Sequence, residues 1–271
     1  MAEIEFRRDL YRGTASYYDR FRVPYPAALI DDLARRADAD GSGTLLDLAC
    51  GTGQLSFALA DRFGAVWAVD QEPDMVDLLT EKARAAGIGH IRAVTAAAEV
   101  LSVPAASFDL VAIGNAFHRL PRDVVAGRVL LWLRPGGLLA LVWGGSPWDG
   151  HAQWQQVLRA VMNHWQALAG AAARVPQGYE AARRDRPDIV VLREAGFEIV
   201  GRFEFTADWG WTPQTLAGHA FSTSVLSRDA LGDLAAAFEA DLLRELAVCE
   251  PSGRIRQPIS FGYDLARRPP A

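Results

Sequence analysis

The sequence has few of the residues on which several common kinds of site depend. Among its 271 residues there are two cysteines, Cys50 and Cys249, and they form no CxxC pair. This excludes a cysteine zinc cluster and a disulfide framework. Lys82 is the only lysine among the 28 basic residues and lies in a charged, helical stretch. Schiff-base chemistry, which needs a desolvated lysine, is therefore not expected.

Long apolar runs and an excess of positive charge are also missing. The most apolar stretch, residues 124–143, contains Arg128, Arg134 and a Pro–Gly–Gly turn, so it does not predict a membrane span. The first ten residues have no apolar segment of the kind that signal peptides carry. The formal net charge is −5 and the pI is near 5.6, which argues against a nucleic-acid partner. We expect a cytoplasmic protein without membrane or nucleic-acid partners.

The length is sufficient for one large domain with a cap, burying about 70–75% of the unfolded surface. From residue 44 onward, short apolar strands alternate with amphipathic helices. The predicted strands are residues 44–49, 65–70, 90–95, 108–113 and 138–143, and the predicted helices are residues 54–62, 74–86 and 122–133. Apolar strands joined by helices are typical of a parallel sheet covered on both faces.

The regions before and after this core are mixed. Before it, we predict helices over residues 6–18 and 27–37, separated by a proline-rich break at 23–26. After it, we predict helices over 151–169, 188–195, 213–220 and 231–248, and strands over 197–206 and 255–265. The fold class is therefore α/β, a Rossmann-like and mostly parallel seven-stranded sheet with helical cap segments at both ends. We divide the chain into a lid, 1–43, and a domain, 44–271, which has a core at 44–143 and helical insertions near 147–195 and 207–250.

Residues 46–55 predict a ligand loop between a strand and a helix. Gly51 and Gly53 allow tight backbone geometry and close approach of a ligand. Asp47, at the strand end, would repel a pyrophosphate but would suit a ligand with an ammonium group. Ser56 stands where a dinucleotide fingerprint has its third glycine, which disfavours nicotinamide binding.

Further segments extend this site. Asp70 ends the second strand, where a carboxylate accepts hydrogen bonds from ribose hydroxyls. Glu99 follows the third strand, where an adenine ring would lie. Residues 107–111 lead into Asn115 and His118, and residues 133–137 form a turn before the fifth strand.

In this order, these segments resemble the motifs of class I S-adenosylmethionine-dependent methyltransferases. LDLACGTG resembles the first motif, which usually has Gly in place of Ala49, and AVD, AAE, SFDLV and LRPGG resemble the later ones. Residues 18–26 resemble the YDxxRxxYP segment of a bacterial small-molecule branch, and residues 258–263 resemble its tail more loosely. Ala97 replaces a frequent Asp, and Arg119 replaces the Trp of the branch's AFHW.

The resemblance implies S-adenosylmethionine as the cofactor and a binding site shared by several segments. We expect Tyr18 and Arg22 to fold over the cofactor, with Arg22 pairing its carboxylate. The cofactor-binding residues implied are Tyr18, Arg22, Asp47, Ala49, Gly51, Thr52, Gly53, Gln54, Asp70, Gln71, Met75, Ala98, Glu99 and Asn115.

Methyl transfer from a sulfonium is an in-line displacement, so the protein must align the reactants and exclude water. His118 lies just beyond the fourth strand, where it could act as a base, because imidazole titrates near neutral pH. Trp143 and Trp148 follow the fifth strand and would form the wall of an apolar acceptor pocket.

Other acceptor classes are disfavoured. Asn115 is not followed by the proline turn that DNA amino-methyltransferases have at this position. Carboxylates do not cluster near the fourth strand, so no metal site is expected.

We therefore predict transfer of a methyl group to oxygen, nitrogen or carbon of a small organic acceptor in specialised metabolism, and a homodimer is compatible with the sequence. Two alternatives stay open. One is a protein that holds the cofactor while it catalyses a cyclisation or rearrangement, and the other is a nicotinamide-dependent oxidoreductase.

Overall fold

A computed structural model describes residues 6–7 and 9–270 of the chain. Within them, seven strands form one sheet in the order β3-β2-β1-β4-β5-β7-β6. The strands are β1 (Thr44–Leu48), β2 (Ala65–Asp70), β3 (Ile91–Thr95), β4 (Phe108–Gly114), β5 (Leu133–Gly144), β6 (Glu198–Trp211) and β7 (Ile255–Arg267). The first five are parallel, and β7 runs antiparallel between β5 and β6. The predicted Rossmann-like α/β fold is confirmed.

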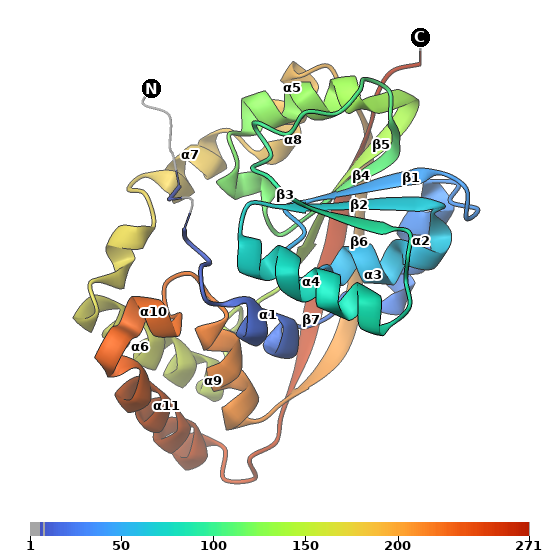
Figure 1. Cartoon of the computed structure of the whole chain (residues 1–271). Coiled ribbons are helices and arrows are strands. Elements are labelled where there is room, and N and C mark those ends of the chain that lie inside the picture. Colours follow the sequence, from blue (N-terminus) through green and yellow to red (C-terminus); the bar gives the residue numbers. More distant parts are fainter. Residues whose placement is uncertain (1–5, 8, 271) are drawn as a thin grey trace.

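Helices cover both faces of the sheet, with α5 (Arg122–Trp132) and α8 (Asp188–Glu194) on one face and α2 (Ala27–Arg36), α3 (Gln54–Leu59) and α4 (Pro73–Ala85) on the other (Figure 1). Neighbouring side chains of one strand point to opposite faces. Leu45 therefore packs in the core cluster that includes Leu29 of α2, while Leu46 packs in the cluster that includes Val129 of α5. Burial on both faces explains why the strands are continuously apolar.

A helical cap lies beside the sheet and is made of segments from both ends of the chain (Figure 1). It consists of α1 (Ala15–Phe21), α6 (Gln153–Leu168), α9 (Pro213–Phe221), α10 (Arg228–Leu231) and α11 (Ala235–Cys249). Aromatic rings join these helices: Phe221 lies 5.4 Å from Phe238 and 5.3 Å from Tyr17, measured between ring centroids. The cap therefore fixes α1 against α9 next to the sheet.

Short elements complete the fold. They are α7 (Tyr179–Asp185) and the 3-10 turns Ala60–Arg62, Phe117–Arg119, Ala171–Arg174 and Gly232–Leu234. Within the described residues, no helix combines the length and the apolarity that crossing a membrane requires.

The prediction of a helix over residues 6–18 is wrong. Residues 9–13 form turns, and α1 begins only at Ala15. Gly13 has a left-handed φ of 75°, and the Thr14 hydroxyl donates to the Tyr11 carbonyl at 2.7 Å. Both features favour a turn over a continuous helix.

Three strand boundaries also differ from the prediction. β6 continues to Trp211 instead of ending at residue 206, because its whole length pairs with β7, so residues 207–211 are strand and not helical insertion. β7 continues to Arg267 beyond the predicted end at 265. β5 begins at Leu133, and the predicted turn at 133–137 forms its irregular first part.

Close packing of β5, β6 and β7 predicts that Gly262 cannot be enlarged. A Cβ atom there would lie 2.5 Å from Cζ2 of Trp143 and 2.6 Å from the Phe203 carbonyl oxygen. Gly262→Ala should lower the free energy of unfolding by about 1–3 kcal/mol, measured by chemical denaturation. Gly210→Ala, on the same strand pair with open space around it, is the control and should change it by less than about 1 kcal/mol. Equal effects would contradict this packing.

Candidate active site

Two cavities meet where the carboxyl ends of the parallel strands open. The smaller has a volume of about 320 Å³ and the larger about 840 Å³. They share the lining residues Tyr11, Tyr18, Asn115, Ala116 and Arg119. The strand order reverses between β1 and β4, and open α/β sheets bind ligands at such a point. The two cavities therefore form one divided site.

The loop after β1 forms one wall of the smaller cavity. Its left-handed φ angles are 58° at Ala49, 54° at Gly51 and 86° at Gly53. The Gly51 amide donates to Oδ2 of Asp70 at 2.8 Å, and the Tyr18 ring covers Gly51, where a Cβ atom would lie 3.4 Å from the ring. A side chain at position 51 would thus be strained by the left-handed φ and would contact the ring.

Asp70 is held at the end of β2 by backbone amides. Its Oδ1 accepts from the Glu72 amide at 2.9 Å and its Oδ2 from Gly51. Burial raises its pKa. The structure gathers most of the predicted cofactor residues around this cavity: Tyr18, Ala49, Gly51, Asp70, Gln71, Met75, Ala98, Glu99 and Asn115.

Asp47, Thr52 and Gly53 line neither cavity. The Asp47 carboxylate is 1% exposed and accepts from the amide and the hydroxyl of Ser56 at 2.9 and 2.6 Å, and burial raises its pKa to about 7. It fastens β1 to α3, so the expected contact with a ligand's ammonium group is wrong for this conformation. A Cβ atom on Gly53 would lie 2.8 Å from Leu79, which makes Gly53 a packing position.

The N-terminal segment borders the larger cavity. Arg22 donates through Nη2 to the Ser222 carbonyl at 3.0 Å and lies 4.8 Å from the centroid of the Tyr18 ring. Gln54, also on the wall of this cavity, donates to the Arg22 carbonyl at 3.5 Å. Tyr18 lines both cavities, and Arg22 lines the larger one together with Trp143 and Trp148.

His118 also lines the larger cavity, but the expectation that it titrates near neutral pH is wrong. Its Nε2 accepts from Nε of Arg119 at 3.2 Å, and its ring packs 6.0 Å from that of Tyr179. Burial, followed by the charges of Arg119, Arg183 and Arg122, lowers its pKa to about 3. The ring is therefore neutral at pH 7 and its basic nitrogen is already engaged, by the arginine that replaces the expected tryptophan.

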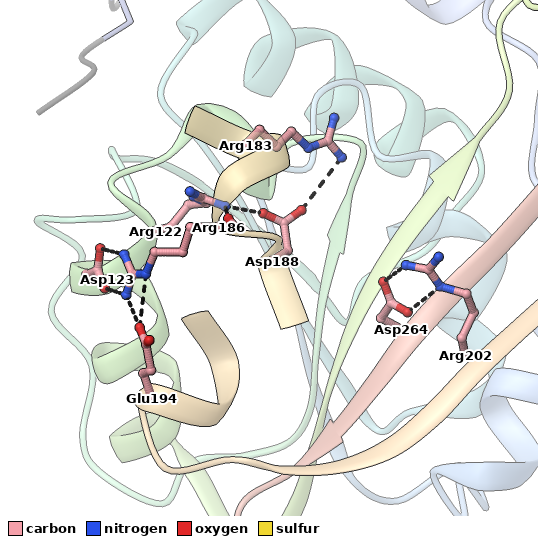
Figure 2. A network of polar contacts seen from close by, with 8 residues as sticks. All are labelled: Arg122, Asp123, Arg183, Arg186, Asp188, Glu194, Arg202 and Asp264. Carbon is pink, nitrogen blue, oxygen red and sulfur yellow. Dashed lines mark hydrogen bonds and ion pairs between the residues drawn. The ribbon is translucent and has the colours of Figure 1, made fainter. Parts of the chain in front are cut away.

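Charged residues that sequence reasoning missed form a further part of this wall (Figure 2). Arg202 makes two hydrogen bonds to Asp264, at 2.7 and 2.8 Å, and Asp188 pairs with Arg122 at 2.8 Å and Arg183 at 3.6 Å. Arg202 and Asp264 are cross-strand neighbours in β6 and β7. Their pairing depends on the register of two distant segments, which no local sequence signal gives.

Three buried polar atoms on the wall of the larger cavity have no hydrogen-bond partner in the described part of the chain. They are Nε of Arg22, Nε1 of Trp143 and Nε2 of His219. His219, which is 3% exposed, was not predicted, because it lies in the otherwise apolar helix α9.

Comparison with known proteins identifies the kind of domain. Residues 45–137 match the family model described as a methyltransferase domain. An uncharacterized methyltransferase of Mycobacterium tuberculosis is 34% identical over 140 residues, 51% of this chain and 54% of that protein, so the chain spans about half the length of the first relatives it matches. The nocamycin O-methyltransferase of Saccharothrix syringae is 28% identical over 95% of this chain and 96% of its own.

Solved structures share the fold over nearly the whole chain. The [4+2]-cyclase SpnF superposes with a TM-score of 0.60 at 18% identity, covering 99% of this chain and 98% of that chain. A putative type II methyltransferase from Anaeromyxobacter dehalogenans superposes with a TM-score of 0.60 at 23% identity, covering 93% and 100%. At these identities the likeness shows the fold alone.

The lowered pKa of His118 predicts a pH effect on stability. A folded-state pKa of about 3, below the usual 6.5, means that the neutral ring contributes stability above pH 6.5, and this contribution is lost as the pH falls. Between pH 7 and pH 5, wild type should therefore lose on the order of 1–2 kcal/mol more than His118→Gln, which cannot titrate. Urea unfolding at both pH values measures the difference.

The control is His151→Gln, because His151 is exposed and solvent surrounds its ring in the folded and the unfolded chain alike. Parallel pH profiles for wild type and His118→Gln would show that His118 is not desolvated.

Proposed function

We propose that the chain is a class I S-adenosylmethionine-dependent methyltransferase that transfers the methyl group of the cofactor to a small organic acceptor, because residues 45–137 match a methyltransferase domain and an O-methyltransferase is similar over almost the whole chain. The observation that carries this proposal is the junction of two cavities of unequal size at Tyr18 and Asn115. One cavity suits a nucleoside, and the other has room for a second molecule.

The smaller cavity would hold the nucleoside. Asp70 is rigidly placed by the Gly51 and Glu72 amides and would accept hydrogen bonds from the two ribose hydroxyls. Ala98 and Glu99 would lie beside the adenine, and Met75 would pack against it.

Arg22 would bind the carboxylate at the amino-acid end of the cofactor. Its Nε is buried without a partner among the described residues, and Arg22 lines the larger cavity beside Tyr18, which lines both cavities. A guanidinium group suits a carboxylate because it offers several donors in one plane. The Tyr18 ring keeps the guanidinium in place from one side.

When bound, the cofactor supplies an electrophilic methyl group, so the residues of the larger cavity need to align the acceptor and exclude water. Trp143 and Trp148 would form apolar walls for it. We assign His118 a place in the wall of this cavity and not the role of a neutral-pH base, since its nitrogen is occupied by Arg119.

We further propose oxygen as the methylated atom, supported by the similarity to the O-methyltransferase of Saccharothrix syringae over almost the whole chain. An acceptor from specialised metabolism, a cytoplasmic location, a homodimer and the absence of nucleic-acid and membrane partners remain predictions from the sequence.

The test is to titrate the protein with S-adenosylmethionine and NAD, and then to look for S-adenosylhomocysteine with a panel of hydroxylated acceptors. Binding of S-adenosylmethionine with acceptor-dependent release of S-adenosylhomocysteine supports the proposal. Conversion of an acceptor without that release would instead support the cyclisation or rearrangement alternative, and binding of NAD alone would support an oxidoreductase.

Replacement of Asp70 should weaken cofactor binding. Asp70→Asn keeps the shape of the side chain but removes its charge, and the affinity for S-adenosylhomocysteine should fall by about 2–4 kcal/mol in calorimetry. Asp77→Asn, which removes an exposed charge from the following helix, is the control and should bind as wild type does. Unchanged affinity in a folded Asp70→Asn protein would refute the ribose contact.

Replacement of Arg22 should affect only ligands that carry the amino-acid part. Arg22→Gln should bind S-adenosylhomocysteine about 10–100-fold more weakly, because a charge-assisted hydrogen bond is lost. Methylthioadenosine, which lacks the carboxylate, should bind nearly as well as to wild type. The control is Arg20→Gln, an exposed arginine of the same helix. Equal weakening of both ligands would assign Arg22 a structural role instead.

A further inference from the structure

His219 is held in one tautomer by its contact with the N-terminal segment. Its Nδ1 lies 3.0 Å from the carbonyl oxygen of Phe21. A carbonyl oxygen can only accept, so Nδ1 carries the proton and donates it. In the neutral ring, Nε2 is then left as a hydrogen-bond acceptor with a free lone pair.

The surroundings of His219 keep the ring neutral. The side chain is 3% exposed, and the rings of Trp148 and Trp211 contact it at centroid distances of 5.6 and 5.3 Å. Burial, followed by the charge of Arg22, lowers its pKa to about 3. At neutral pH, Nε2 of this ring can therefore accept a hydrogen bond but cannot donate one.

The described part of the chain provides no hydrogen-bond donor for Nε2 of His219. This atom is buried, and His219 is part of the wall of the larger cavity. Buried polar atoms of folded proteins are rarely left without a partner. His118 differs, because Arg119 already donates to its Nε2.

We propose that Nε2 of His219 accepts a hydrogen bond from a hydroxyl group of the methyl acceptor, and that this acceptor is an aromatic or conjugated hydroxy compound held beside Trp148. This assignment rests on the proposed function, which makes the larger cavity the acceptor site. Trp148, which also lines this cavity, supplies an apolar ring that contacts the His219 ring. Such a site rejects analogues that lack the hydroxyl hydrogen, because the nitrogen would stay unpaired.

The test compares 2-naphthol with 2-methoxynaphthalene, which has the same ring but no hydroxyl hydrogen. With the protein saturated with S-adenosylhomocysteine, wild type should bind 2-naphthol about 3–10-fold more tightly than the ether. His219→Asn can still donate to the Phe21 carbonyl but presents no acceptor at the place of Nε2, so the two probes should bind equally. His219→Gln can place its amide oxygen near that position and should recover part of the preference.

A second measurement does not depend on the variants folding. In protein labelled with nitrogen-15 in its histidines, the Nε2 resonance of His219 should show an unprotonated nitrogen at pH 7 and should shift with 2-naphthol but not with the ether. Equal affinity of wild type for the two probes, or a protonated Nε2, would overturn the inference.

The two proposals fail separately. If S-adenosylhomocysteine does not bind in calorimetry, the proposed function fails, whereas the preference for 2-naphthol can still be measured in the protein without it. If the protein binds S-adenosylhomocysteine but a water molecule satisfies Nε2 and both probes bind alike, only the assignment of His219 fails.

Discussion

The hydrogen bond from the Gly51 amide to Asp70 joins the ends of β1 and β2, and the rest of the site depends on it. It holds the glycine loop in a left-handed backbone conformation that leaves no side chain above it. Tyr18 lies over this bare loop, and Arg22 lies against Tyr18. The buried carboxylate of Asp70 thus holds the loop that lines the smaller cavity. The segment with Tyr18 and Arg22 packs on that loop.

The same N-terminal segment, with Tyr18 and Arg22, also packs against α9. Gly218 allows this contact, since a Cβ atom there would lie 2.5 Å from the ring of Phe21. The Phe21 carbonyl accepts from His219, and the Ser222 carbonyl accepts from Arg22. The walls of the larger cavity thus join segments that come from opposite ends of the chain.

The sequence predicted what local patterns determine: the seven strands, the glycine loop and the position of Asp70 at a strand end. The predictions from the sequence were wrong or incomplete where contacts between distant segments determine an element's boundary or a side chain's state. The start of α1 depends on turns at Gly13, and the full length of β6 depends on pairing with β7. The state of His118 depends on Arg119, which the comparison with AFHW singled out, and on the contact with α7, which no motif reveals. His219 was missed because the sequence of its helix predicts only apolar packing. Its tautomer depends on the Phe21 carbonyl, which lies 198 positions away in the chain.

The charged residues in Figure 2 that line the larger cavity are paired with one another, so the polar atoms without a partner are expected to orient a molecule there. Arg202 donates to both carboxylate oxygens of Asp264 through Nε and Nη2, and Asp188 is shared between two arginines. Each of these carboxylates is thus paired with at least one arginine, which weakens its field across the cavity. Three buried atoms of other residues in the wall of this cavity have no hydrogen-bond partner among the described residues. They are two donors, Nε of Arg22 and Nε1 of Trp143, and one acceptor, Nε2 of His219. Discrimination between molecules of similar shape then depends on whether a molecule matches that pattern, because a mismatch leaves a buried polar atom unpaired.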